Sequence, residues 1–206
     1  MEELMTLEDI KKECPRVDVA NEAFVPIIKE FKSIKTKDQK DDLINQVKDY
    51  SLLEDNVTAD NRTLKHVWAL FGKIDKDTWI CIEVGSSKDI KSEICSNLDS
   101  MYVTEVSNTY KYSFFHTNKS IYNALSYADK VSCKYRHINH LFNNFKWVEI
   151  DVNKYLEKID TKDYDRDSYA EVKCAVDYRA LMWNPAPRTD EWDVLRDEYS
   201  VEYRRD

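Results

Sequence analysis

Glycine is scarce in this chain: Gly72 and Gly85 are the only two glycines among 206 residues. Average usage would give roughly fourteen. Glycine-rich phosphate cradles, collagen-like repeats and glycine-punctuated propeller blades all need more glycine than this. The sequence therefore excludes the P-loop and dinucleotide-binding classes that depend on such loops.

The charge of the chain is acidic but unevenly distributed. Lys and Arg number 31 against 39 Asp and Glu, a net charge of −8. The first 60 residues carry 9 basic and 15 acidic residues, residues 189–206 carry 3 and 7, and residues 107–154 carry 7 and 3. This excludes a uniformly basic shell of the kind that coats nucleic acid, whereas a local basic face in the middle of the chain can coexist with a negative total.

The composition also indicates the cellular compartment in which we expect the protein. Hydrophobic residues make up 42% of the chain, with 13 Tyr and 5 Trp, which favours a packed globule over disorder. No apolar run approaches the roughly 18 residues of a membrane span, and the acidic amino terminus is unlike a secretory signal. The five cysteines include no C-x-x-C pair, so neither a zinc knuckle nor a disulfide framework is indicated. We expect a cytoplasmic protein without a membrane partner.

Three regions are predicted along the chain: a helical region at 1–60, a central domain at 61–188 and an acidic tail at 189–206. In the first region apolar residues recur at helical spacing. These residues are Phe24, Ile27, Ile28 and Phe31, followed by Leu43, Ile44 and Val47. Pro15 and Pro26 are interpreted as helix starts or breaks. The polar stretch 54–62 is the predicted linker.

The central domain begins with a predicted hairpin. Residues 66–75 and 79–85 are rich in β-branched, aromatic and apolar residues, and Gly72 to Asp77 supplies the turn. Gly85 is predicted to make a tight turn from the second strand into a helix. Ser86 and Asp89 form an S-x-x-D capping signature ahead of that helix, whose Ile90, Ile94 and Leu98 share one face.

Later segments complete an α+β pattern, which predicts a small, mainly antiparallel sheet flanked by helices. Residues 102–106 and 110–115 are predicted to be extended, and 120–145 to form one long helix or a broken pair. Residues 145–152 alternate as a strand does. Residues 168–183 have helical periodicity that ends at Asn184 and Pro185, because proline cannot continue a helix.

The order of strand, turn, strand, glycine and helix resembles the GIY-YIG nuclease superfamily. His66 to Leu70 stands at the place of the first motif, Glu83-Val84-Gly85 at the second, and Ser86 to Lys91 resembles the polar turn and helix start that follow. Glu171 matches the late metal-binding glutamate and Asn184 the terminal asparagine. The resemblance covers residues 65–188, about 60% of the chain. It implies a nuclease fold and a divalent cation, Mg²⁺ or Mn²⁺, held by Glu171.

The sequence departs from the family at the catalytic positions. The first tyrosine position is Trp68, whose indole donates a hydrogen bond but cannot act as a base. The second tyrosine position is Glu83, and the helix arginine aligns with Glu93. If Glu83, Glu93 and Glu171 converge, they form either a hard-metal site, in which a glutamate serves as general base, or an acidic patch that repels phosphate.

Basic residues are the candidates for nucleic-acid contact. Four lie near the predicted hairpin and can compensate part of the lost positive charge, and two lie in the basic middle of the chain, where aromatic residues interleave. They are Lys65, His66, Lys88 and Lys91, with Lys134 and Arg136. His137 and His140 share a helical face, either as a metal pair or, more simply, as histidines on a helix rim.

Two functions follow from these residues. One is a divergent GIY-YIG-type protein that acts on nucleic acid as a metal-dependent endonuclease with a degenerate site. The other is a catalytically inactive GIY-YIG-like module that binds a protein partner, such as an inhibitor or a defence-related adaptor. Glu171→Ala distinguishes them, since cleavage that survives this substitution would contradict the metal-dependent mechanism.

Overall fold

A computed structural model describes residues 7–53, 65–76, 78–102, 127–161 and 165–182. Four antiparallel strands form one sheet in the order β1-β4-β2-β3. The strands are β1 (Phe24–Lys32), β2 (His66–Lys73), β3 (Trp79–Ser87) and β4 (Asn144–Ile150). The described helices are α1 (Leu7–Glu13), α2 (Lys37–Asp49), α3 (Ile90–Met101), α5 (Tyr127–Leu141), α6 (Val152–Tyr155) and α7 (Arg166–Asp177). The α+β class predicted from the sequence is confirmed.

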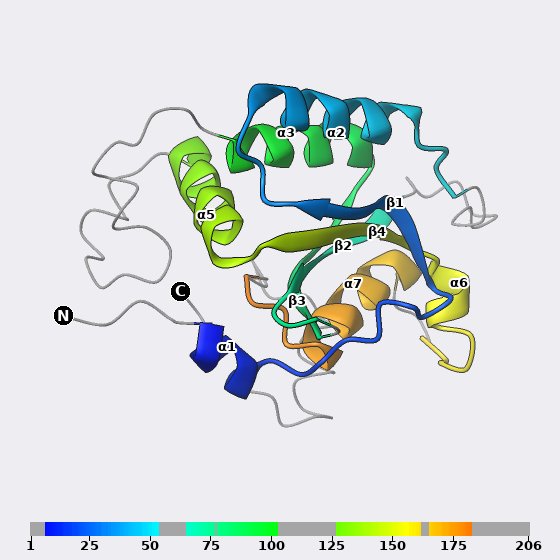
Figure 1. The fold of residues 1–206 in the computed structure, drawn as a ribbon. Helices are drawn as coiled ribbons and strands as arrows, with labels where there is room; N and C mark the ends of the chain where they lie inside the picture. The colour runs from blue at the N-terminus through cyan, green and yellow to red at the C-terminus, as the bar shows by residue number, and fades with distance from the viewer. Residues whose placement is uncertain (1–6, 54–64, 77, 103–126, 162–164, 183–206) are drawn as a thin grey trace.

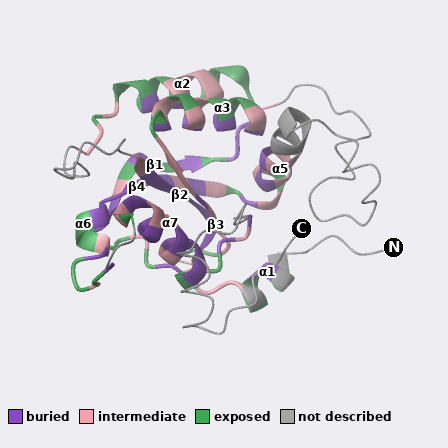
Figure 2. Ribbon diagram, turned by 180° about the vertical axis from the view of Figure 1, so that it is seen from behind, coloured by how far each residue is buried: buried purple, intermediate pink, exposed green. Residues whose placement is uncertain are grey.

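Helices cover both faces of the sheet (Figure 1). One apolar cluster joins the sheet to α2, α3 and α5, and a second joins its other face to α6 and α7. Along β2 the side chains alternate between them, so that Trp68 and Leu70 belong to the first cluster and Val67 and Ala69 to the second. Figure 2 shows the buried residues concentrated on the sheet and on α7. In the described parts of the chain, no helix is long and apolar enough to cross a membrane.

The predicted helix at residues 24–31 is wrong, because these residues form β1. Phe24, Ile27, Ile28 and Phe31 are all buried, but β1 is irregular, with register shifts between Pro26 and Ile28 and between Ile28 and Phe31. Those irregularities replace strict alternation by an i, i+3, i+4, i+7 pattern that imitates a helix. Pro26 is tolerated because β1 is an edge strand. The region before residue 60 is therefore not all helical, since β1 shares the sheet with strands that follow the predicted boundary.

Several other sequence predictions are confirmed. β2 and β3 pair as the predicted hairpin, β4 is the predicted alternating strand, and α5 lies inside the predicted long helix. The helix predicted from Leu43, Ile44 and Val47 is α2, which begins with a capping box between Thr36 and Gln39. The predicted extended segments from residue 103 on, the linker and the acidic tail lie outside the described residues.

Both glycines lie inside strands, so neither makes the turn predicted for it. Gly72 belongs to β2, and the hairpin turn comes after Lys73. Gly85 belongs to β3, which continues to Ser87, and neither glycine has a positive φ. The reason for glycine is close packing: a Cβ at Gly85 would lie 2.7 Å from the Trp68 ring, and a Cβ at Gly72 would lie 2.6 Å from the Phe142 ring.

We expect Gly85→Ala to destabilise the fold by about 1–3 kcal/mol, because the Trp68 indole must move away from the added methyl group. Chemical denaturation measures the loss. The matched control is the same substitution in a Trp68→Phe background, where the smaller ring relieves the clash and the penalty shrinks. An equal penalty in both backgrounds would contradict this explanation.

Two helix ends also differ from prediction. The N-cap of α3 is Asp89, whose carboxylate accepts from Ser92 N at 3.1 Å, rather than Ser86. α7 ends at Asp177, before the predicted stop at Asn184, and Arg179 follows with a φ of 45°. The chain then runs beside β3, where Leu181 N and Met182 N donate to the carbonyls of Cys81 and Ile82. The segment after α7 therefore satisfies backbone carbonyls at this edge of the sheet.

Candidate functional site at the open end of the hairpin

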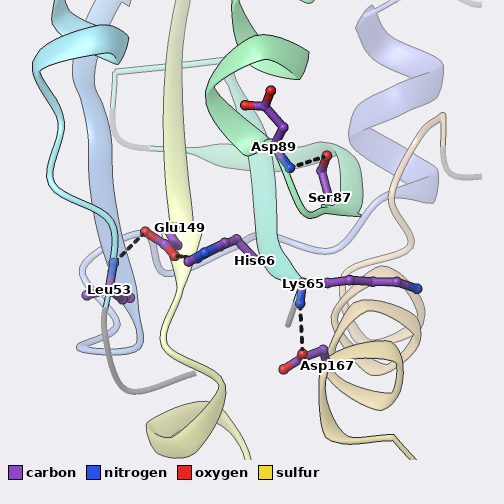
Figure 3. Close-up of polar contacts among 7 residues, drawn as sticks. All are labelled: Leu53, Lys65, His66, Ser87, Asp89, Glu149 and Asp167. Atoms are coloured by element: carbon purple, nitrogen blue, oxygen red, sulfur yellow. Dashed lines mark hydrogen bonds and ion pairs between the residues drawn. The ribbon is translucent and has the colours of Figure 1, made fainter. Parts of the chain in front are cut away.

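The strand register brings most of the predicted site residues to one end of the sheet. At the open end of the hairpin His66 lies opposite Ser87, and Trp68 lies opposite Gly85. Lys65 and Lys88 immediately flank the first of these pairs in the sequence. Residues that stand 17 and 21 positions apart in the chain therefore meet in space, and Figure 3 shows this end of the sheet.

His66 is held by a buried carboxylate. Its Nδ1 lies 2.5 Å from Oε1 of Glu149, a β4 residue whose side chain is 0% exposed, and the other carboxylate oxygen accepts from Leu53 N at 3.2 Å (Figure 3). An ionised carboxylate can only accept, so Nδ1 is the donor. This fixes the imidazole tautomer and leaves Nε2 without a partner among the described residues. The His66 side chain remains 16% exposed.

Tyr50 and Asp167 flank this pair from two different elements. Burial and the charge of Glu149 raise the pKa of Tyr50, the C-terminal cap of α2. Asp167, in the first turn of α7, accepts from Lys65 N at 3.3 Å (Figure 3). Burial raises the pKa of Asp167, while the hydrogen bond from Lys65 N and the charge of His66 act in the opposite direction. The backbone entering β2 is thus anchored to α7.

Glu83 is paired with a cation. Its carboxylate forms an ion pair with Lys134 and accepts a hydrogen bond from the Tyr135 hydroxyl at 2.6 Å. The side chain of Glu83 is 13% exposed and that of Lys134 is 17% exposed. The ammonium of Lys134, a predicted nucleic-acid contact, is therefore engaged within the chain.

Glu93 lies in the first turn of α3, close to both other glutamates. Burial raises the pKa of Glu93 most, and the charges of Glu83 and Glu171 raise it further. Ser87 and the Trp68 indole lower it by facing the carboxylate. The Trp68 N–H is buried and has no hydrogen-bond partner within the described part of the chain. Carboxyl groups whose pKa is shifted by burial and by neighbouring charges cluster at functional sites.

Glu171 reaches the same end of the sheet from the opposite face. It lies on α7, and its Oε2 accepts from the Ser86 hydroxyl at 2.5 Å. The three glutamates predicted to converge are thus near one another, and each interacts with its own neighbours. Among the residues that the structure describes, no group of three His, Cys, Asp or Glu side chains is placed to hold a metal ion. The Mg²⁺ or Mn²⁺ ion expected at Glu171 stays a prediction.

The remaining predicted residues are distributed around this end. Lys88 is exposed. Lys91 donates to the Lys48 carbonyl at 2.7 Å, which satisfies the C-terminal end of α2. Arg136 is half-buried on α5. Asn184 lies outside the described residues.

Sequence reasoning missed Glu149, Asp167 and Tyr135. The sequence did contain a signal for Glu149, because this residue follows the core residue Trp147 by two positions in an alternating strand and so points to the same buried face. A carboxylate on a buried face needs a partner. Asp167 and Tyr135 carry no such local signal, since their partners Lys65 and Glu83 are distant in the sequence.

Comparison with known proteins adds no assignment: no family model matches the chain, and no curated protein or solved structure matches it. The GIY-YIG resemblance therefore stays a prediction, carried by the motifs alone.

Proposed function

We propose that this protein cleaves the phosphodiester backbone of nucleic acid at the open end of the β2–β3 hairpin, by acid–base chemistry carried by its own side chains. The observation that carries the proposal is the register of His66 opposite Ser87. This register brings His66 to the same end of the sheet as Ser87 and Trp68, which both face the Glu93 carboxyl group of α3. The GIY-YIG resemblance supports the substrate class.

His66 is the proposed general base. Glu149 holds its Nδ1–H, so Nε2 presents a lone pair that can accept a proton from water or from a ribose hydroxyl. As the new oxygen–phosphorus bond forms, the imidazolium is stabilised by the buried Glu149 carboxylate. A histidine without this partner would be free to rotate and would lose the orientation.

Glu93 is the proposed general acid. Its raised pKa keeps a larger fraction protonated near neutral pH, so it can donate a proton to the leaving oxygen as the phosphorus–oxygen bond breaks. Lys65 and Lys88 are the proposed phosphate contacts, since they adjoin the paired residues His66 and Ser87 in the chain and carry long, flexible cationic side chains. These groups supply the base, acid and positive charge that phosphodiester cleavage requires.

The test is cleavage of single-stranded RNA, single-stranded DNA and duplex DNA in excess chelator. We expect cleavage of at least one substrate without added metal, and its loss in His66→Gln. The matched control is His140→Gln, which removes an exposed histidine of α5. Cleavage that requires Mg²⁺ or Mn²⁺ and disappears in Glu171→Ala would instead support the metal-dependent mechanism, and equal activity of His66→Gln and wild type would contradict the role of His66.

A second function is favoured by the internal pairing of Glu83 and Glu171. Lys134 and Tyr135 bind the Glu83 carboxylate, and Ser86 binds the Glu171 carboxylate. This arrangement is expected of a former active site whose residues now stabilise the fold. On this proposal the protein is an inactive GIY-YIG-like module that binds a protein partner. A folded wild-type protein that cuts no nucleic acid, with or without metal, would favour this function over cleavage.

A further inference from the structure

A cavity of about 480 Å³ lies near the opposite, turn end of the hairpin. Its walls come from the segment that follows α1 and from the ends of β2 and β3, and its main lining residues are Arg16, Val17, Val19, Lys73, Lys76 and Trp79. A backbone hydrogen bond of 2.9 Å from Val17 N to the Trp79 carbonyl joins the two walls. Figure 1 shows this segment passing beneath the sheet on its way from α1 to β1. The volume suits a small ligand.

The lining is positive although the chain as a whole is acidic. Among the described residues, three basic side chains line the cavity against one acidic residue, Asp18. Lys73 is paired with Glu30 at 3.0 Å and lies over the Trp79 ring at 5.1 Å. Arg16 and Lys76 are exposed, and no acidic partner for either lies within the described ranges. Two cations therefore remain available to an anion.

A further cation lies behind the cavity wall. Lys146 Nζ donates to the Val19 carbonyl at 2.9 Å, and the side chain is half-buried. Burial lowers the pKa of Lys146, against the opposing charges of Glu30 and Asp18. The Asp18 carboxylate accepts from Ala20 N at 2.9 Å and keeps its negative charge. The described cations Arg16, Lys73, Lys76 and Lys146 therefore outnumber the carboxylates Asp18 and Glu30 by four to two.

We propose that this cavity binds a phosphate monoester attached to a planar group. Arg16 and Lys76 would hold the phosphate, because guanidinium and ammonium groups form strong charge-assisted hydrogen bonds to it. Val17, Val19 and Trp79 supply the apolar wall for the planar group. Two sources share this chemistry: a free nucleoside monophosphate and the 5′-phosphorylated end of a nucleic-acid strand. The site is separate from the open end of the hairpin and does not depend on the proposed cleavage.

Isothermal titration calorimetry of the full chain tests the proposal. The probes are adenosine monophosphate, adenosine, and an oligonucleotide with either a 5′-phosphate or a 5′-hydroxyl. We expect binding of a phosphorylated probe, no binding of its unphosphorylated counterpart, and weakening by roughly tenfold or more in Arg16→Gln and in Lys76→Gln. The affinity should also fall as salt is raised. Comparing the affinity for the 5′-phosphorylated oligonucleotide with the affinity for adenosine monophosphate identifies which of the two sources the cavity prefers.

Both substitutions are at exposed positions and are expected to leave the fold intact, which circular dichroism checks. The matched control is Lys158→Gln, an exposed lysine outside the cavity lining, which changes the net charge equally. Failure of both phosphorylated probes to bind would overturn the proposal. So would affinities of Arg16→Gln and Lys76→Gln equal to that of Lys158→Gln.

Discussion

Glu149→Ala is expected to lower the free energy of unfolding by about 2–5 kcal/mol, because two donors lose their acceptor at a cost of roughly 1–3 kcal/mol each. The Glu149 carboxylate is fully buried and is bound to both His66 and the backbone of Leu53. Alanine leaves the Leu53 N–H and His66 Nδ1 without their acceptor and opens a cavity beside them. Urea denaturation followed by tryptophan fluorescence measures the change.

Two variants isolate the cause. Glu149→Gln keeps an acceptor of the same shape and should cost less than alanine. Tyr50→Phe removes a buried hydroxyl that faces the Glu149 carboxylate, so it measures that contact separately from the contacts with His66 and Leu53. A double-mutant cycle of Glu149→Ala with His66→Ala should show strong coupling. Additive effects in that cycle would refute the buried pair as the source of the stability.

Local patterns were sufficient for the hairpin, for α3 and for β4, because each is specified by its own residues. β4 alternates, α3 repeats its apolar residues at helical spacing, and the two apolar runs of the hairpin are separated by a polar turn. Local patterns were insufficient for β1, where two register shifts changed the spacing between buried residues from the alternation expected of a strand. Irregularity in a strand is set by its neighbour in the sheet, here β4, and leaves no mark within the strand itself.

Glycine illustrates the same limit. The sequence marked Gly85 as important and attributed it to a turn, although the physical cause is the Trp68 ring across the strand pair. A close approach between distant residues and a left-handed backbone both require glycine. One sequence cannot separate the two causes, because the neighbour that fills the space is brought there only by folding.

Some members of the candidate site were selected from the sequence, but Glu149, Asp167 and Tyr135 were missed and the pairing was not predicted. Glu83, Glu93 and Glu171 were selected through the family resemblance, and the structure places them around the end of β3. Their partners, Lys134 for Glu83 and Ser86 for Glu171, come from tertiary contacts across 51 and 85 positions of the chain. Such contacts decide whether a carboxylate binds a metal, moves a proton or stabilises the fold.

Glu93→Gln carries the second large expected effect and rests on the proposed function. As a general acid, Glu93 contributes roughly 10²- to 10⁴-fold to the cleavage rate, and the glutamine variant should lose that factor. In the wild type the rate should fall as pH rises through the raised pKa of Glu93, because the protonated form is the donor. This limb of the pH–rate profile should be absent in Glu93→Gln. An unchanged profile would contradict the assignment.

A stability measurement tests the pKa independently of catalysis. A carboxyl group whose pKa is raised in the folded state binds its proton more tightly there than in the unfolded chain. Its contribution to stability is therefore fully present below the ordinary pKa and is lost as pH rises through the folded-state value. Glu93→Gln should gain stability relative to the wild type as pH rises from the ordinary glutamate pKa of 4.5 through the raised folded-state value. The exposed-site control Glu22→Gln should show no such gain, and the same trend in both variants would mean that the environment of Glu93 does not raise its pKa.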